Sequence, residues 1–288
     1  MRRVEKDPCY IVYVDGGLCS QMQQYMQGKY LERRGFKVKY DLSFYRNYKG
    51  TGVNAREFVL LDIFGNLQFD LANRFEATKY KLLYPNRTTV RGDSSQYGNL
   101  PFIPMAPCYV GGHYHLGMMN CIDFQETFEF TIDEKRLGEQ NLKYLELIQN
   151  SKHSVGVHVR RGDMAFSGGY WTVLEPEYYL NAIQQFDKTS DFFFFSDEPE
   201  WVTEKILPIL PADTKCFLAP AGNDVTVDFY LMSQCNDYIA SQGSMGKYVW
   251  LINKDSKLVL PIATCGKDCK NAWDYLGEKY DSNIIFVE

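Results

Sequence analysis

Apolar runs alternate with helix-forming segments over the second half of the chain, and this alternation limits the fold more than any other feature. The apolar runs span residues 154–159, 191–195, 215–218, 238–240, 257–262 and 284–287. Helix-forming segments lie between most of them, at residues 176–186, 199–207, 226–234 and 244–253. Strands that alternate with helices and are apolar on both faces are typical of a parallel sheet covered by helices on both sides. The second half is therefore predicted to be a doubly wound α/β domain.

The amino-terminal part predicts a smaller unit of the same kind. A β-branched and aromatic run at residues 10–14 leads to Gly16 and Gly17 and then to a helix-forming segment that ends near Gly35. A second strand at residues 37–40 completes a β-α-β unit. Residues 42–109 follow no persistent period; helices are expected within them at residues 56–64 and 69–80, and their proline-rich end should be extended or turning.

A helix is expected within residues 133–150, where leucine and isoleucine recur on one face. The polar stretch QNSKHS follows it, so we place the domain boundary after residue 150. The predicted domains are residues 1–150 and residues 151–288, and a chain of 288 residues is long enough for both.

The charge of the chain narrows the class of partner. The formal net charge is -5, whereas a protein that holds a nucleic-acid backbone normally presents a basic field. Nucleic acid is therefore excluded as a partner. The adjacent pair Arg160 and Arg161 indicates instead a small anion that is bound at one place.

The hydropathy pattern predicts a soluble protein. The apolar run at residues 9–14 is too short for a signal sequence, and no stretch has the roughly 18 to 20 apolar residues of a spanning helix. We expect a cytoplasmic protein with at most peripheral contact with the inner membrane face. The 8 cysteines lack regular spacing and are expected to be reduced thiols. Cys265 and Cys269 have no partner pair, so a zinc site is not expected.

The segment GVHVRRGD at residues 156–163 places charges at the end of the first strand of the second domain. Parallel sheets of this class bind ligands at the carboxyl ends of their strands. Alternate residues of a strand share a face, so His158 and Arg160 should point one way and Arg161 the other. A guanidinium there offers a planar fork to phosphate oxygens. The alternative is that Arg160 pairs with Asp163 and only ties a loop.

Three further places in the sequence have a functional and a structural interpretation. The turn at residues 241–246 carries serine and glycine before a helix and suits a diphosphate, but it is also consistent with an ordinary capped turn. Asp15 is a candidate general base by position, or it caps the helix that follows. His113 and His115 alternate on one strand-like face, but a third metal ligand is not evident, so surface or acceptor-site imidazoles are expected.

Four segments, taken in order, resemble glycosyltransferase family 11, the inverting α-1,2-fucosyltransferases. The segments are GGLCSQMQQY at residues 16–25, HVRRGDM at residues 158–164, FSDEPEWV at residues 195–202 and DFYLMS at residues 228–233, the last followed by the turn at residues 241–246. The resemblance implies a GT-B architecture, in which two Rossmann-like domains face each other across a cleft. It also implies that the first domain binds the acceptor, that the second binds the GDP-sugar, and that no metal or other cofactor is required.

The resemblance also implies roles for particular residues. Arg160 is expected to contact the donor diphosphate, with His158 orienting the nucleotide or the arginine and Asp163 holding the loop. The residues expected to bind the donor are Arg161, Gly16, Gly17, Gln21, Ser196, Asp197, Asp228, Ser241, Gly243, Ser244 and Met245. The chain departs from the family pattern at Cys19 and Ser20, where the family has GN, and at Met245, where it has phenylalanine. These departures bear first on the choice of acceptor.

The activity implied is transfer of L-fucose from GDP-β-L-fucose to the 2-hydroxyl of a sugar, often galactose, in a glycan or a lipid-linked polysaccharide precursor of a bacterium. One alternative is the same fold with a different nucleotide sugar or linkage. The other is a module that binds a nucleotide or glycan without catalysis.

Overall fold

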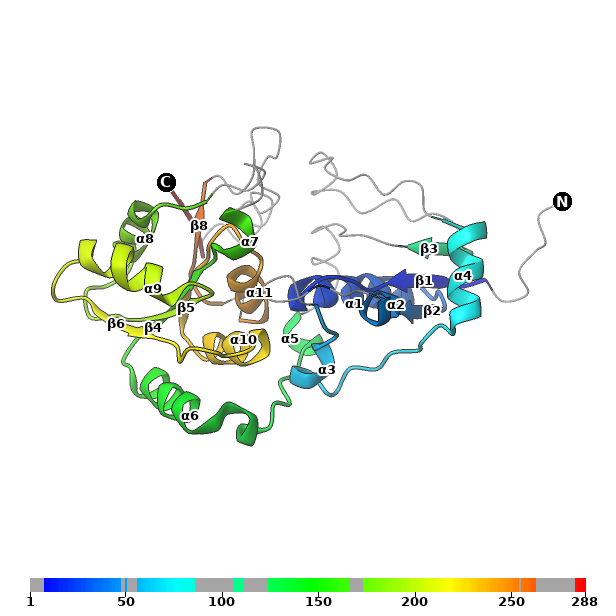
Figure 1. Cartoon of the computed structure of the whole chain (residues 1–288), viewed down its shortest axis with the longest axis horizontal. Coiled ribbons are helices and arrows are strands. Elements are labelled where there is room, and N and C mark those ends of the chain that lie inside the picture. The colour runs from blue at the N-terminus through cyan, green and yellow to red at the C-terminus, as the bar shows by residue number, and fades with distance from the viewer. Residues whose placement is uncertain are drawn as a thin grey trace. The chain divides into compact units, whose positions relative to one another are not determined.

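The structure is a computed structural model that describes residues 8–47, 50, 56–85, 106–110, 124–165, 173–253, 255–262 and 283–288. Contacts between residues divide the chain into two compact units, Met1–Glu129 and Phe130–Glu288. Each unit contains a parallel sheet with helices (Figure 1). The predicted α/β class is therefore confirmed, whereas the cleft between two domains stays a prediction.

The described part of unit 1 contains three parallel strands, with β1 (Tyr10–Tyr13) between β2 (Val38–Asp41) and β3 (Cys108–Val110). Its helices are α1 (Leu18–Arg33), α2 (Ser43–Asn47), α3 (Leu60–Ile63), α4 (Arg74–Leu83) and α5 (Phe124–Thr127). The predicted β-α-β unit is present as β1, α1 and β2. The helix expected at residues 56–64 is confined to α3.

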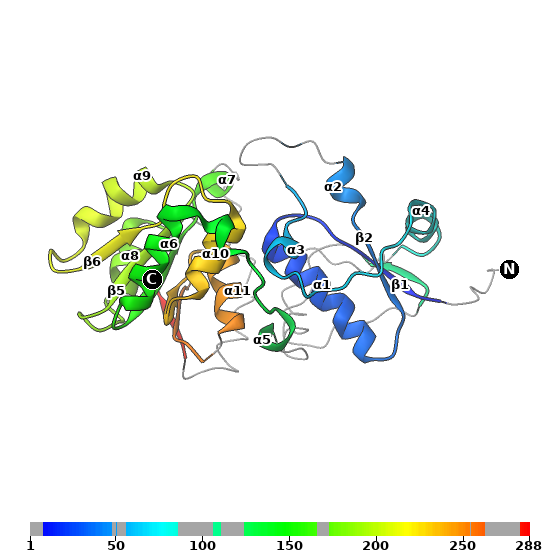
Figure 2. The same cartoon turned by 90° about the horizontal axis from the view of Figure 1, so that it is seen from below.

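Helices α1 and α4 cover opposite faces of this small sheet (Figure 2). Ile11 of β1 joins Ala77 and Tyr80 of α4 in one apolar cluster. Tyr40 of β2 instead stacks on Tyr25 of α1, with 5.7 Å between the ring centroids. Both faces of the parallel sheet are therefore buried, as its apolar strands require.

Helix α4 begins later than the sequence predicted. The backbone N–H of Ala72 donates to the carbonyl of Tyr40 at 2.9 Å, so the chain runs beside β2 up to this point. Asn73 then accepts a hydrogen bond from the backbone N–H of Glu76 at 2.9 Å, while the Glu76 carboxylate accepts one from the N–H of Asn73 at 3.0 Å. This capping box satisfies two end groups of the helix and sets its first turn.

The described part of unit 2 contains six parallel strands in the order β6-β5-β4-β7-β8-β9. Their bounds are β4 (Ser154–Val159), β5 (Asp191–Ser196), β6 (Lys215–Leu218), β7 (Asp237–Ile239), β8 (Leu258–Pro261) and β9 (Ile284–Val287). Each strand predicted for the second half is present, close to its expected range. The doubly wound interpretation of this half is thus confirmed.

The helices of unit 2 form layers on both sides of the sheet. They are α6 (Glu134–Asn150), α7 (Gly162–Ala165), α8 (Pro176–Ile183), α9 (Pro199–Trp201), α10 (Val225–Ser233) and α11 (Met245–Ile252). Helix α9 continues as a π-helical turn (Val202–Ile206) and a 3-10 turn (Leu207–Ile209). No helix in the described ranges combines the length and apolarity that crossing a bilayer requires.

The phenylalanine run of β5 serves both helical layers. Phe192 and Phe194 belong to the apolar cluster that includes α8. Phe193 and Phe195 meet the ring of Tyr144 on α6 edge-on, with centroids 5.6 and 5.8 Å apart. Figure 1 shows α8 and α6 on opposite sides of the sheet. Continuous apolarity in this strand therefore reflects burial of both faces.

Unit 2 begins before α6, whereas the sequence placed the boundary after residue 150. The ring of Phe130 lies 6.2 Å from that of Phe229 and 5.5 Å from that of Tyr230. Helix α6 also buries its apolar face on the sheet of unit 2 through Tyr144. These contacts attach residues 130–150 to the second unit.

Candidate active site

The carboxyl ends of three neighbouring strands in unit 2 carry most of the predicted donor-binding residues. Arg160 follows β4, Asp197 follows β5 and Ser241 lies just after β7. The strand order reverses between β4 and β7, because the chain adds β5 and β6 on one side of β4 and β7, β8 and β9 on the other. Open parallel sheets bind ligands beside such a reversal.

Arg160 forms an ion pair with a residue of the neighbouring loop. Its Nη1 lies 2.8 Å from Oδ2 of Asp197, and the two side chains are 28% and 20% exposed. A guanidinium has five N–H donors in a planar fork, so it can serve a carboxylate and a second anion together. The ion pair therefore holds the Arg160 guanidinium in place and leaves it partly exposed to solvent. The side chain of Asp163, the alternative partner, lies outside the described part of the structure.

Gly162 makes this ion pair possible. A Cβ atom at this position would overlap Oδ2 of Asp197 and would lie 3.7 Å from the guanidinium carbon of Arg160. Only a residue without a side chain lets the carboxylate pack against the backbone here. The glycine of the RGD segment thus has a steric role beside the arginine.

His158 lies buried beneath the arginine. Its Nδ1 is 3.0 Å from the hydroxyl of Ser241, and only 6% of the residue is exposed. Burial, together with the positive charges of Arg160 and Lys247, lowers the pKa of His158 to about 3. The ring is therefore neutral near pH 7 and is buried, so it acts as a positioning group for the turn after β7.

The depressed pKa of His158 predicts a particular loss of stability in acid. The unfolded chain takes up this proton below about pH 6.5, whereas the folded protein resists it until about pH 3. The contribution of neutral His158 to the free energy of unfolding is fully present above pH 6.5. It is lost as the pH falls, by about 1.4 kcal/mol per pH unit for one proton. His158→Asn should remove this contribution from the dependence of the free energy of unfolding on pH, measured by urea unfolding between pH 6 and 4. An unchanged slope would contradict the neutral, buried ring.

The turn after β7 divides into buried and exposed residues. Ser241 is fully buried and its hydroxyl faces His158, while Gly243 packs so closely that a Cβ would lie 3.4 Å from the imidazole Cε1 atom. Ser244 is exposed and Met245 is partly exposed, at the start of α11. Ser244 makes no side-chain cap hydrogen bond to the helix. Of the four residues predicted to bind the donor here, Ser244 and Met245 are thus the accessible ones.

Two buried polar residues in this region were not predicted. The Gln242 side-chain amide donates to the carbonyl of Arg160 at 2.9 Å, and Lys247 donates to the carbonyl of Gln242 at 3.1 Å. The residues are 3% and 1% exposed. They tie the turn after β7 to the residue that carries the ion pair. A lysine within the apolar segment MGKYVWLI was the sequence signal for a buried cation.

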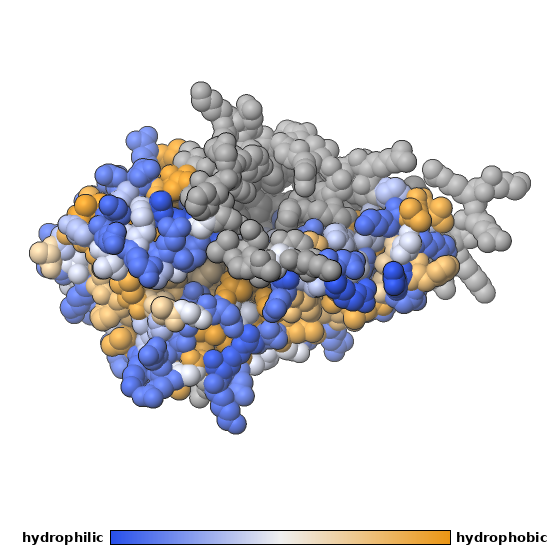
Figure 3. Space-filling model, viewed as in Figure 1, coloured by the Kyte–Doolittle hydropathy of each residue, from blue (hydrophilic) through white to orange (hydrophobic). Residues whose placement is uncertain are grey.

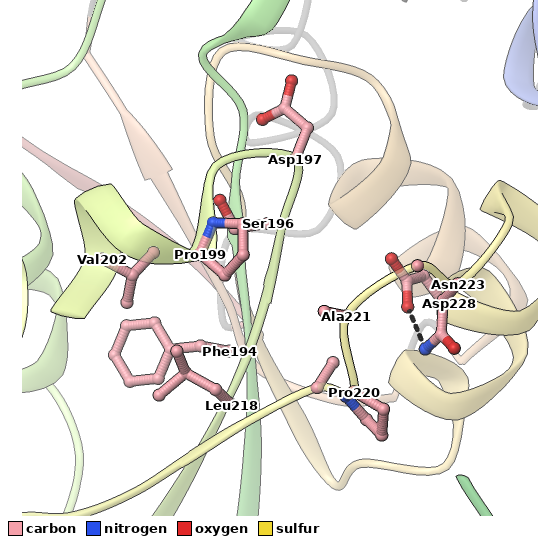
Figure 4. A pocket seen from close by; sticks show the side chains of 12 residues that line it. Phe194, Ser196, Asp197, Pro199, Val202, Leu218, Pro220, Ala221, Asn223 and Asp228 are labelled. Atoms are coloured by element: carbon pink, nitrogen blue, oxygen red, sulfur yellow. Dashed lines mark hydrogen bonds between the residues drawn. The ribbon is translucent and has the colours of Figure 1, made fainter. Parts of the chain in front are cut away.

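A cavity of about 250 Å³ opens beside the ion pair, at the ends of β5 and β6. Figure 4 shows the side chains that line it. Ser196, Asp197 and Asp228, three of the predicted donor-binding residues, lie in its wall together. The other lining residues are Phe194, Pro199, Val202, Leu218, Ala219, Pro220, Ala221, Gly222 and Asn223. The loop at residues 219–222 was missed because alanine, proline and glycine carry no reactive or charged side chain that a sequence motif could reveal.

Asp228 is the polar group at one side of this cavity (Figure 4). Its Oδ1 accepts a hydrogen bond from the side-chain amide of Asn223 at 2.8 Å. Burial raises the pKa of Asp228 to about 6; the hydrogen bond from Asn223 opposes this effect and the charge of Asp224 adds to it. A carboxylate that faces an apolar wall suits a flat heterocycle with N–H donors.

Arg161 has a different carboxylate partner from Arg160. Its guanidinium carbon lies 4.0 Å from the ring centroid of Trp201, and Nε lies 3.2 Å from the carboxylate of Glu198. Its backbone N–H donates to the Asp197 carboxylate at 3.1 Å. The side chain is thus used within the loop structure, which argues against the expected direct contact with a donor.

Gln21 also serves the fold rather than an open site. Its amide donates to the carbonyl groups of Gly16 at 3.3 Å and Glu57 at 2.7 Å, and its oxygen accepts from the backbone N–H of Val59 and Leu60, both at 3.1 Å. The side chain is completely buried in unit 1. The expected contact between Gln21 and the donor is therefore not supported.

The glycine pair beside it forms the entry to α1. Gly16 has a φ of 75°, which favours glycine, and Gly17 is the N-cap of the helix without a side-chain hydrogen bond. Asp15 does not cap α1; its Oδ1 accepts a hydrogen bond from the Gln24 amide at 2.6 Å. The three residues belong to unit 1, whereas the ion pair and the turn after β7 belong to unit 2.

The described residues contain no group of three or more histidine, cysteine, aspartate or glutamate side chains that could hold a metal ion. The cysteines within these ranges, Cys9, Cys19, Cys108, Cys216 and Cys235, form no disulfide bonds with one another. Four residues considered from sequence as metal ligands or site imidazoles lie outside the described residues: His113, His115, Cys265 and Cys269.

Comparison with solved structures gives matches of low sequence identity. Fucosyltransferase NodZ from Bradyrhizobium is 14% identical, with a TM-score of 0.49, and the match covers 86% of this chain and 94% of NodZ. NodZ α-1,6-fucosyltransferase soaked with GDP-fucose is 13% identical, with a TM-score of 0.45 and coverage of 86% and 93%. Comparison with curated proteins gives no match.

A family model gives the decisive comparison. The model described as glycosyl transferase family 11 matches residues 105–270. The matched segment is more than half of the chain and contains Arg160, Asp197, Asp228 and the turn after β7. It therefore includes the whole of the unit 2 site. On this ground the chain belongs to glycosyl transferase family 11.

Proposed function

We propose that the protein transfers L-fucose from GDP-β-L-fucose to the 2-hydroxyl of an acceptor sugar such as galactose, with inversion at the anomeric carbon. One juxtaposition supports the donor part of this proposal. The partly exposed guanidinium of Arg160 is held by Asp197, which also lines the cavity. A nucleotide sugar needs a cation for its diphosphate and a pocket for its base, and these two features adjoin here.

Arg160 would stabilise the leaving group. The bond between the anomeric carbon and the β-phosphate oxygen breaks, its electron pair stays on GDP, and the acceptor oxygen forms the new bond from the opposite face. Negative charge thus grows on the β-phosphate, where a fixed guanidinium stabilises the transition state more than the ground state. The acceptor hydroxyl gives up its proton to a base as the new bond forms.

The cavity would hold the guanine base. Phe194, Val202 and Leu218 give it an apolar wall, while the Asp228 carboxylate can accept hydrogen bonds from the ring N–H and the exocyclic amine of guanine. Adenine lacks this pair of donors on one edge. Asp228 would therefore favour GDP over ADP.

The neutral His158 and the buried turn after β7 would position the exposed residues near the diphosphate. His158 orients Ser241, and Gln242 links the turn to the backbone of Arg160. Ser244 and Met245 would then present the backbone N–H groups at the start of α11 to the donor. We further propose that the reaction requires no metal, because Arg160 and this helix end supply the positive charge.

Gly162→Ala tests whether the ion pair sets donor affinity. The new methyl group would displace the Asp197 carboxylate, so Arg160 would lose its fixed partner. We expect GDP to bind about tenfold more weakly in isothermal titration, the loss of one charge-assisted hydrogen bond. Ala212→Gly, which changes one methyl group at an exposed position of unit 2, is the control and should bind GDP as the wild type does. Equal affinity in the Gly162 variant and the wild type would contradict this role.

The proposed function is tested with GDP-fucose and a galactose-terminated acceptor such as lactose in the presence of EDTA. Mass spectrometry should show addition of one deoxyhexose, and NMR should place it on the 2-hydroxyl with an α-configured linkage. Parallel reactions with GDP-mannose and UDP-galactose control for the donor. Transfer only from another nucleotide sugar would contradict the proposed donor. GDP binding without transfer to any acceptor would indicate a non-catalytic module.

A further inference from the structure

Helix α4 of unit 1 presents apolar side chains to solvent on the face opposite its core contacts. Ala77 and Tyr80 are buried against the sheet. Phe75 is 79% exposed and Leu82 is 74% exposed. Residues seven apart in a helix share a face, so Phe75 and Leu82 lie one above the other, away from the buried side. An outward helix face is ordinarily polar, so this arrangement needs a physical reason.

Two more leucines extend the apolar surface. Leu83 follows in the last turn of α4 and is 61% exposed. Leu71, just before the helix, is 53% exposed. Several exposed apolar side chains on one helix mark an interaction surface more often than a single exposed leucine does. Phe75, Leu82 and Leu83 together form what we call the outer face of α4.

Basic residues border the outer face of α4. Helical geometry places Arg74 and Lys81 on one side of the line from Phe75 to Leu82 and Lys79 on the other. The acidic residue of the helix, Glu76, is neutralised by Lys39, with 2.7 Å between Nζ and Oε1. The helix therefore carries net positive charge in a chain whose net charge is -5. Figure 3 shows orange and blue atoms side by side where Figure 1 places α4.

We propose that the outer face of α4 binds the surface of a membrane that contains anionic lipid. Phenylalanine and leucine side chains enter the boundary between headgroups and acyl chains, while lysine and arginine on both flanks contact the lipid phosphates. This combination of chemistry matches an anionic bilayer, because a purely apolar protein partner would offer no negative charge to the basic side chains beside the apolar ones. The inference concerns a surface of unit 1 and is independent of the proposed transfer reaction.

Vesicle sedimentation tests the proposal with the full chain. Phosphatidylcholine vesicles are compared with vesicles that also contain about 30% phosphatidylglycerol. The wild type should pellet with the anionic vesicles, weakly with the neutral ones, and less as salt is raised. Phe75→Ser with Leu82→Ser should lower partitioning at least about tenfold, because two inserted side chains are lost. Arg74→Gln with Lys81→Gln should lower it chiefly for anionic vesicles.

The matched control is Leu147→Ser on α6, an apolar residue that is 46% exposed and lies in unit 2. It should bind vesicles as the wild type does. Circular dichroism should show that every variant is folded, since each altered side chain faces solvent. Wild-type protein that stays in the supernatant with anionic vesicles would overturn the proposal. Wild-type vesicle binding by the variant with Phe75→Ser and Leu82→Ser would also overturn it. So would a result in which this variant keeps its vesicle binding and loses only self-association, measured by sedimentation velocity.

Discussion

Replacing Arg160 by alanine should lower kcat/KM for fucosyl transfer by about a hundred- to a thousandfold, the cost of losing one fixed group that stabilises charge in a transition state. The guanidinium lies 2.8 Å from the Asp197 carboxylate and is 28% exposed. It is therefore held in place yet open to a diphosphate. Most of the loss should appear in kcat, because charge on the β-phosphate grows as the glycosidic bond breaks.

The control for this variant is Arg34→Ala, in which a surface guanidinium stacked 4.6 Å from the Tyr30 ring centroid is removed from unit 1. It should leave transfer unchanged. Arg160→Lys should be intermediate, because an ammonium supplies charge without the planar fork. Steady-state kinetics with GDP-fucose measure all three. Wild-type rates in Arg160→Ala, with the fold intact, would contradict the assigned role.

Asp228→Asn should weaken GDP binding by about ten- to a hundredfold, because a hydrogen bond to a charged acceptor is lost at a buried site. The amide keeps the shape of the carboxyl group, and Asn223 can still donate to its oxygen. The wild type should also lose GDP affinity as the pH falls below about 6, where the free carboxyl group takes up a proton. The variant should lack this pH dependence in isothermal titration.

Asp228→Asn should also raise the free energy of unfolding near pH 7 when no GDP is bound. Burial raises the pKa of Asp228 in the folded state above its ordinary value, so ionisation is costly there. The free energy of unfolding therefore falls as the pH rises from about 4 to about 6, by about 1.4 kcal/mol per pH unit for this proton. Asp213→Asn, at an exposed position, is the control. Weaker binding with no gain in stability would contradict a buried carboxylate at Asp228.

The sheet of unit 2 could be predicted because its strands repeat one strong pattern. Each strand is apolar on both faces, and β5 shows the reason, since Phe192 and Phe193 face different helical layers. The domain boundary could not be predicted in the same way. Amphipathic periodicity shows that α6 has an apolar face but not which sheet covers it. The contacts of Tyr144 attach it to unit 2.

Some residues of the candidate site could be predicted from the sequence, whereas their contacts could not. Ser196, Asp197 and Asp228 were identified from short motifs, and the structure places them around one cavity. The partner of Arg160 was not predicted, because a contact between loops that are far apart along the chain depends on strand order. The hydrogen bonds of Gln21 to the backbone of unit 1 could not be predicted, because a buried amide that serves the backbone carries the same letter as one that binds a ligand.

A crystal structure of the protein with GDP would show whether the cavity and Arg160 form one donor site. The guanine base should occupy the cavity beside Phe194 and Asp228, and an oxygen of the β-phosphate should lie within hydrogen-bonding distance of Arg160. A base bound elsewhere, or a diphosphate beyond hydrogen-bonding distance of Arg160, would contradict the donor site assigned to unit 2.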